Sequence, residues 1–260
     1  MSIPTAAIIL AAGKGTRMNS DLPKVVHETC GAPMVCWVAR ACLEAGATRL
    51  IVVVGHRQEL VREAMERIDP GDATIEFATQ DEQLGTGHAV RCAQPLLDAF
   101  AGDIVVLCGD GPLIRPETVV QLIDEHQRAN AAATLATAIV EDPAGYGRII
   151  RDDAGAFVGI VEDKNATDEQ KRINEINPSY YCFGADHLWA GLRMVARDEA
   201  SGEYYLTDVP SLLLESGERV GALSAVAAQD ALSVNTPEQL AQTDRILRDR
   251  LAEQTTGVNT

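Results

Sequence analysis

The sequence is short of positive charge. Among its 260 residues, Lys and Arg number 22 against 38 Asp and Glu, which gives a formal net charge of −16 at pH 7. This balance disfavours a nucleic acid or an anionic membrane surface as the main partner, because both are bound through clustered positive charge. A chain this negative must gather its few cations in one place if it binds an anion.

Several signals of other protein classes are also missing. The six cysteines contain no CxxC pair and most lie among apolar residues, so neither a zinc site nor a disulfide framework is indicated. No segment reaches the roughly 18 unbroken apolar residues that span a bilayer. The N-terminus lacks the charged start and long apolar stretch of a targeting signal. We therefore expect a reduced, cytoplasmic protein, and without a linker or internal repeat we expect one domain.

The first half of the chain alternates short apolar runs with segments of helical periodicity. Strands are predicted over residues 6–10, 50–54, 74–78 and 104–107, and helices over residues 33–45, 58–68, 86–100 and 117–128. This alternation predicts an α/β fold, a Rossmann-like arrangement with a mostly parallel central sheet covered on both faces. Ligands of such sheets bind at the carboxyl ends of the strands, which here are Leu10, Ala78 and Cys108.

The chain beyond about residue 130 has a different texture. Strands are predicted over residues 133–140, 147–151 and 157–162, a helix over 184–195 and a last helix over 237–254, which runs into a polar tail. This half is α+β in character, and we expect it to extend the same sheet.

A glycine-rich loop follows the first predicted strand. Residues 7–24 read AIILAAGKGTRMNSDLPK, so Gly13 and Gly15 are accompanied by the cations Lys14, Arg17 and Lys24. Glycine lets the backbone N–H groups of a strand-to-helix loop approach a phosphate, and Arg adds a forked donor. Neither GxxxxGK[ST] nor GxGxxG is present, so a P-loop NTPase and a classical dinucleotide oxidoreductase are both disfavoured.

This loop resembles the signature of the sugar-phosphate nucleotidyltransferases. The remaining motifs are similar, in the same order, to the uridylyltransferase domain of the bacterial N-acetylglucosamine-1-phosphate enzymes: QDEQLGTGHA, LCGDGPL, GYGRI, GIVEDKNATDEQ, EIN, GEYYLTD and VNTPEQL. The resemblance implies one glycosyltransferase-A-like nucleotidyltransferase domain over residues 1–260. Its nucleotide-binding half would be residues 1–130, its sugar-binding half 131–240, and its C-terminal helix and tail 241–260.

The resemblance also implies the residues of the nucleotide site. Arg17 and Lys24 take the catalytic positions, where they would meet charge that develops on the triphosphate. Gln80 would read the uracil together with the turn that follows it, because an amide both donates and accepts hydrogen bonds. The positions that match the family's nucleotide contacts are Leu10, Ala11, Ala12, Gly13, Lys24, Gln80, Gly85 and Thr86.

The resemblance further implies a metal ion and a sugar site next to the nucleotide site. Asp110 and Asn235 match the ligands of Mg²⁺, an ion that one or two protein oxygens plus phosphate oxygens satisfy. We interpret His56 and His88 as structural. The positions that match sugar contacts are Cys108, Gly109, Asp110, Gly147, Glu162, Asn177 and Asn235.

The function that the resemblance implies is Mg²⁺-dependent transfer of UMP from UTP to N-acetylglucosamine 1-phosphate. The phosphate of the sugar would attack the α-phosphorus in line and pyrophosphate would leave. Small-molecule substrates, and neither nucleic acid nor membrane, are the expected partners. Two alternatives stay open: a nucleotidyltransferase for a different sugar 1-phosphate, and a regulatory protein that binds a nucleotide sugar without turnover.

The sequence departs from the family pattern in ways that concern the sugar. Asn177 is followed by Pro-Ser-Tyr-Tyr where relatives continue with a small pair, Cys108 stands where many have tyrosine, and Gly111 replaces a branched residue. The hexapeptide repeats of a left-handed β-helix are also absent from residues 1–260. We therefore expect no acetyl transfer from this chain, and its oligomeric state stays open.

Overall fold

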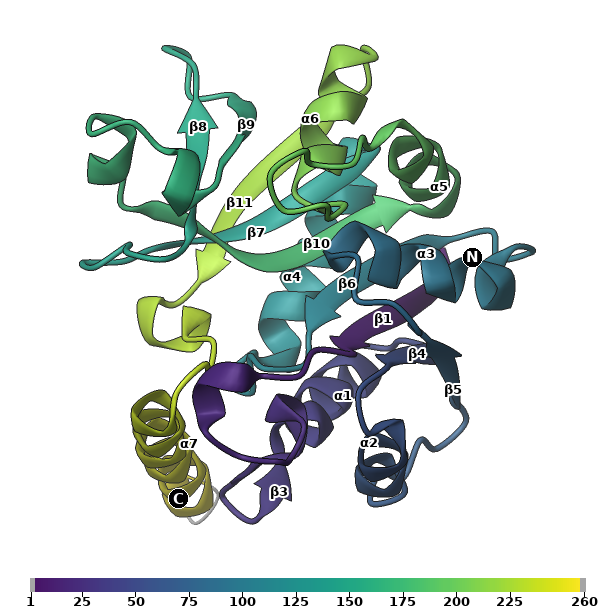
Figure 1. Ribbon diagram of the computed structural model, residues 1–260, viewed down its shortest axis with the longest axis vertical. Helices are drawn as coiled ribbons and strands as arrows, with labels where there is room; N and C mark the ends of the chain where they lie inside the picture. Colours follow the sequence, from purple (N-terminus) through teal and green to yellow (C-terminus); the bar gives the residue numbers. More distant parts are fainter. Residues whose placement is uncertain (1–2, 258–260) are drawn as a thin grey trace.

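The computed structural model describes residues 3–257, and its central feature is a nine-stranded mixed sheet (Figure 1). Four parallel strands of the first half form one side of this sheet in the order β6-β1-β4-β5. Their bounds are β1 Thr5–Ala11, β4 Arg49–Val54, β5 Thr74–Thr79 and β6 Asp103–Cys108. The strands predicted at these places are confirmed to within a residue or two.

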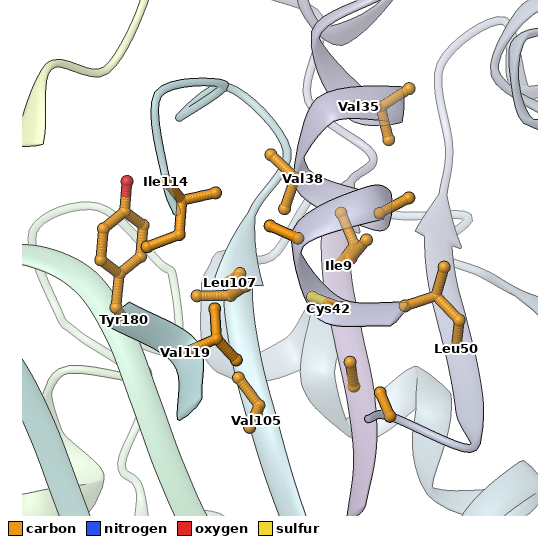
Figure 2. Close-up of a cluster of buried hydrophobic side chains, with 14 of the residues drawn as sticks. Ile9, Val35, Val38, Cys42, Leu50, Val105, Leu107, Ile114, Val119 and Tyr180 are labelled. Carbon is orange, nitrogen blue, oxygen red and sulfur yellow. The ribbon is translucent and has the colours of Figure 1, made fainter. Parts of the chain in front are cut away.

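Helices cover both faces of these strands, so alternate strand residues enter two different cores. Ile9 packs in one cluster with side chains of the helices at residues 34–44, 58–65 and 116–129, whereas Ile8 packs in the other with those at residues 86–97, 185–194 and 208–215. Figure 2 shows the first cluster, where Ile9 lies beside the helix that carries Val38 and Cys42, and Leu107 lies near Ile114 and Val119. Burial on both faces is the reason these strands read as unbroken apolar runs.

The helices of the first half agree with prediction in place and differ at their ends. The bounds are α1 Met34–Glu44, α2 Gln58–Met65, α3 Thr86–Leu97 and α4 Pro116–Ala129. The second and third of these are three residues shorter than predicted, because the segments that follow turn back toward the next strand. A short antiparallel hairpin of β2 Glu28–Thr29 and β3 Ala32–Pro33 directly precedes α1.

The second half extends the same sheet, as predicted, through one antiparallel strand. The full order is β11-β7-β10-β6-β1-β4-β5, with β10 antiparallel to both of its neighbours and β11 parallel to β7. The bounds are β7 Ala133–Ile139, β10 Glu175–Gly184 and β11 Val220–Val226. Of these three, only β7 is predicted from the sequence.

A hairpin and three helices complete the fold. β8 Gly147–Arg151 and β9 Phe157–Val161 pair with each other, and the start of β8 also pairs with β10, so the hairpin stands off from the main sheet (Figure 1). The helices are α5 Ala185–Met194, α6 Asp208–Glu215 and α7 Pro237–Gly257. The prediction misses α6 and is right about α5 and α7, while residues 258–260 of the predicted tail lie outside the described residues. Within residues 3–257, none of the helices is long and apolar enough to cross a membrane.

Candidate active site

The loop after β1 passes close to a second loop that carries Lys24. Gly15 adopts a left-handed conformation with φ of 66°, and a Cβ atom there would lie 2.4 Å from the Cβ of Lys24. Only glycine satisfies both conditions. At Gly13, by contrast, a Cβ would meet no atom of the described residues within 4 Å. The backbone at Gly13 is therefore open to an approaching ligand, as the phosphate-binding interpretation requires.

Four predicted residues from three distant segments meet beside this loop. The Lys24 ammonium contacts the carboxylate of Asp110 and lies 2.9 Å from Oδ1 of Asn235. The same oxygen accepts a hydrogen bond of 2.8 Å from Nη2 of Arg17, which is 218 positions away along the chain. The structure thus brings both predicted catalytic residues and both predicted metal ligands into one hydrogen-bonded cluster, which we call the cation cluster: Arg17, Lys24, Asp110 and Asn235.

Hydrogen bonds of their own backbone groups hold Asp110 and Asn235, the two residues that supply oxygen atoms to this cluster, in place. Asp110 follows β6, and its carbonyl oxygen accepts a hydrogen bond of 2.9 Å from the N–H of Val234. The N–H of Asn235 donates to Oε1 of Gln239 in the first turn of α7 at 2.8 Å. The start of the last helix is therefore fastened to the end of a central strand, which is why a residue so late in the sequence reaches the site.

The cation cluster suits anionic ligands and a hard cation. It holds two positive side chains, one carboxylate and one neutral amide in a chain with a net charge of −16. Within the described residues, no three His, Cys, Asp or Glu side chains gather so as to hold a metal by themselves. Mg²⁺ needs no such cage, because one carboxylate, a neutral oxygen and phosphate oxygens are enough. The oxygens of Asp110 and Asn235, which already share the Lys24 ammonium, fit that ion.

The predicted base-binding residues lie together at the start of α3. Gln80 is 3% exposed, and its side-chain Nε2 donates to the carbonyl oxygen of Gly85 at 3.1 Å. Gly85 has φ of 91°, and a Cβ there would lie 2.6 Å from the carbonyl oxygen of Tyr204. Thr86 Oγ1 accepts a hydrogen bond from the N–H of Leu206. The turn that opens α3 is therefore fixed by a loop from the second half of the chain.

The remaining nucleotide-side predictions lie on or just after β1. Leu10 is half-buried, and its carbonyl oxygen accepts a hydrogen bond of 2.9 Å from the N–H of Gly109. Ala11 and Ala12 are buried, and the carbonyl oxygen of Ala12 accepts from the N–H of His56. Of these three residues, Leu10 lines a cavity of the site, and hydrogen bonds of the Leu10 and Ala12 carbonyl groups fix the backbone beneath it.

Most of the predicted sugar contacts line one cavity of about 190 Å³. Gly109 is the exception, because it does not line this cavity. It is buried, and a Cβ there would lie 3.1 Å from the carbonyl oxygen of Leu10. A second cavity of about 330 Å³ runs from Leu10 and Thr86 to Tyr181, and both cavities are lined by Cys108, Glu162 and Ser179. The nucleotide side and the sugar side therefore share walls. The predicted residues that line the first cavity are Cys108, Asp110, Gly147, Glu162, Asn177 and Asn235.

The polar side chains of the sugar side are already bonded within the protein. Asn177 donates from Nδ2 to the hydroxyl of Tyr181 at 2.6 Å and accepts on Oδ1 from the N–H of Ser179 at 3.0 Å. Glu162 accepts from Oγ1 of Thr207 at 3.0 Å. Sequence reasoning singles out Ser179 and Tyr181 as part of the Pro-Ser-Tyr-Tyr departure beside the sugar, but it does not predict the strand β10 that aligns them. Thr207 is a residue of the site that sequence reasoning misses.

Burial keeps one thiol and one phenol hydroxyl of these walls protonated. Burial, with a smaller contribution from the negative charge of Asp110, raises the pKa of the Cys108 thiol to about 12. Burial likewise raises the pKa of the Tyr181 hydroxyl well above its usual value. Near neutral pH both groups are therefore neutral hydrogen-bonding groups rather than nucleophiles.

Two departures from the family pattern explain each other. Tyr180 points to the opposite face of β10 from Tyr181 and packs in the first core cluster (Figure 2). A Cβ on Gly111 would lie 2.7 Å from the hydroxyl oxygen of Tyr180. Glycine at position 111 therefore makes room for the side chain of Tyr180. These two departures concern packing in the core and not contact with the sugar.

The fold and the site together define a class of protein: an α/β protein that binds an anionic ligand at the carboxyl edge of a mostly parallel sheet, with cations on a glycine loop. The chain matches the nucleotidyl transferase family over residues 6–230. It belongs to that family, and it is a nucleotidyltransferase.

Individual relatives narrow the comparison. The chain is 47% identical over 246 residues to the bifunctional protein GlmU of Geobacter metallireducens, a match that covers 95% of this chain and 51% of that protein. It is 45% identical over 245 residues to GlmU of Heliobacterium modesticaldum, with 94% and 52% covered. The chain therefore spans about half the length of these relatives. Among solved structures, a UDP-glucose pyrophosphorylase in complex with UDP-glucose has the same fold, with a TM-score of 0.77, 17% identity, and 95% of this chain and 99% of that chain covered.

Proposed function

We propose that the protein transfers UMP from UTP to N-acetylglucosamine 1-phosphate in a Mg²⁺-dependent reaction in the cytoplasm, with release of pyrophosphate. The observation that carries the proposal is the cation cluster, which joins the glycine loop to the cavity that Gly147 and Asn177 line. The 47% identity to a bifunctional GlmU protein supports this choice among the reactions of the family.

Charge neutralisation and positioning are the chemistry that these residues can supply. The phosphate of the sugar 1-phosphate is the nucleophile, and since its second pKa is about 6, it is largely ionised at neutral pH without a side-chain base. Arg17 and Lys24 both donate to Asn235 Oδ1, and they would stabilise the charge that develops on the departing pyrophosphate. Gly13 and its neighbours would bring backbone N–H groups to the same phosphates.

Mg²⁺ would be held by the carboxylate of Asp110 and the amide oxygen of Asn235, and when bound it neutralises phosphate charge. The neutral amide of Asn235 matters here, because a second carboxylate would cancel more of the positive charge that the phosphates need. Lys24 contacts both oxygens and so adds a fixed positive charge beside them.

A second candidate is the same reaction with a different sugar 1-phosphate. The observation that favours it is the amide of Asn177, whose oxygen and one N–H are bonded to Ser179 and Tyr181. An amide that is tied to its own chain has less capacity to face the acetamido group of the sugar.

The test is pyrophosphate release by the purified chain with UTP and Mg²⁺. N-acetylglucosamine 1-phosphate is compared with glucose 1-phosphate and the galactosamine analogue. Release with the first sugar supports the proposal, and release with only another sugar supports the second candidate. UTP binding by calorimetry without release from any sugar would contradict both.

A further inference from the structure

The orientation of the Gln80 amide is set by a carbonyl group of its own chain. The backbone N–H of Gln80 donates to the carbonyl oxygen of Val54, which places the residue directly after β5. Its side-chain Nε2 lies 3.1 Å from the carbonyl oxygen of Gly85. A carbonyl oxygen only accepts hydrogen bonds, so the NH₂ end of the amide, and not the oxygen, faces Gly85.

The second hydrogen of this NH₂ group points at a histidine. Nε2 of Gln80 lies 3.1 Å from Nδ1 of His88, which is in the first turn of α3. Since an NH₂ group can only donate, Nδ1 is the acceptor, and the neutral ring carries its proton on Nε2. Nε2 of His88 faces the sulfur of Cys92, one turn further along α3, at 4.0 Å. A thiol sulfur is a weak acceptor, so this contact agrees with the same tautomer.

Because these two contacts use both hydrogens of the Gln80 NH₂ group, only the amide oxygen is left to bind a ligand. Within the described residues, Oε1 has no hydrogen-bond partner, and neither has the N–H of Gly85. The pair therefore offers one acceptor and one donor. Uracil presents an N3–H donor beside an O4 acceptor, whereas cytosine presents the reverse pattern, an N3 acceptor beside an amino donor.

We propose that His88 is a positioning residue that holds Gln80 with its oxygen toward the base, and that it thereby selects uridine over cytidine nucleotides. This rests on the proposed function, in which Gln80 meets the base. An inverted Gln80 amide could donate to N3 of cytosine, but it would set its oxygen against both Gly85 O and His88 Nδ1. Removing the His88 acceptor takes away one of these two restraints and leaves the other.

The matched pair of variants is His88→Leu and His88→Asn. Both are close in size, but the Asn oxygen is attached to Cγ, as Nδ1 is in histidine, and can accept from Gln80. We expect His88→Leu to lower the ratio of kcat/KM for UTP to that for CTP about tenfold, mainly through a higher KM for UTP, because one neutral hydrogen bond is worth roughly a factor of ten. His88→Asn should restore most of the ratio. Equal losses with UTP and CTP in His88→Leu, at an unchanged ratio, would overturn the proposal.

A measurement on the unaltered protein does not depend on how the variants fold. A two-bond ¹H–¹⁵N NMR spectrum at pH 8 reports which ring nitrogen of His88 carries the proton. The proposal requires the Nε2–H tautomer, and an Nδ1–H tautomer would overturn it.

Calorimetric binding of UTP and CTP separates this proposal from the function on which it rests. Preference for UTP that is lost in His88→Leu supports it, even without turnover. Equal binding of both nucleotides by the unaltered protein overturns the selectivity alone. Binding of neither overturns the proposed function, and the selectivity with it.

Discussion

The two halves of the sheet build their parts of the site in different ways. In the first half, backbone geometry dominates: Gly15 and Gly85 adopt positive φ angles at points where a Cβ would clash. In the second half, side-chain networks dominate: Asn177 is held by Tyr181 and Ser179, and Glu162 by Thr207. Backbone requirements leave a local mark in the sequence, whereas a network of side chains can be rebuilt with other residues. The second half is therefore where substrate preference can change at least cost to the fold.

The largest expected effect tests the first half. We expect Asp110→Asn to lower Mg²⁺-dependent kcat with every sugar 1-phosphate by on the order of 10³ or more, because it removes the one carboxylate of the cation cluster. Steady-state pyrophosphate release over a Mg²⁺ titration measures the effect. Asp153→Asn, at an exposed turn of the β8–β9 hairpin, is the matched control. A loss confined to one sugar would mean that Asp110 belongs with the second half instead.

The next effect concerns the departing pyrophosphate. We expect Arg17→Ala to lower kcat by on the order of 10² with a much smaller change in KM for UTP, since its guanidinium would stabilise charge that develops during the reaction. Rapid-quench kinetics separates the chemical step from binding. Arg128→Ala removes an exposed arginine of α4 that pairs with Glu125 and should change neither value. An unchanged kcat in Arg17→Ala would contradict the catalytic role.

A third effect concerns the segment that carries Asn235 to the first half. The Asp230 carboxylate is 1% exposed and contacts the guanidinium groups of Arg115 and Arg250. We expect Asp230→Ala to lower the free energy of unfolding by about 3 kcal/mol, because it leaves the half-buried Arg250 without its carboxylate partner. Guanidinium denaturation measures this. Glu125→Ala, which removes an exposed ion pair, should cost less than about 1 kcal/mol. Similar losses in both variants would mean that Asp230 is not a structural link.

The two halves of the chain also differ in how well the sequence predicts their structure. The apolar strands β1, β4 and β6 are predictable because helices bury both of their faces, which leaves unbroken apolar runs. The cation cluster is predictable only through the family resemblance, because its members lie up to 218 positions apart. Nothing local in the sequence places Asn235 beside Arg17.

In the second half, the sequence pattern does not reveal β10, the strand that joins the two halves of the sheet. β10 contains Asn177-Pro178-Ser179, where Ser179 has φ of 66° and the pairing register with β7 shifts. A proline and a left-handed residue inside a strand are signals of a loop, so alternation cannot be read there. Which of Tyr180 and Tyr181 faces the cavity depends on that irregularity, and a shift of one residue would exchange them. His88 is a similar case, because its only sequence signal is its place in the first turn of α3.

The smallest effect tests the second half alone. Tyr181→Phe removes the hydroxyl that accepts from Nδ2 of Asn177 and leaves the ring, which stacks on Phe183 at 5.6 Å between centroids. One lost neutral hydrogen bond is worth about 1 kcal/mol, so we expect a roughly fivefold change in KM for the sugar 1-phosphate, with KM for UTP unchanged.

The direction of that change identifies which sugar the network favours. If the Tyr181 hydroxyl orients the Asn177 amide for an acetamido group, KM rises for N-acetylglucosamine 1-phosphate and not for glucose 1-phosphate. If the hydroxyl instead withholds the amide from the sugar, KM falls for the acetamido sugar. Steady-state kinetics with both sugars decides between these results, and Tyr180→Phe is the matched control because its ring packs on the opposite face of β10. A change in KM for UTP as large as that for the sugar would show that β10 serves both substrates, and the two halves of the site would then not be separable.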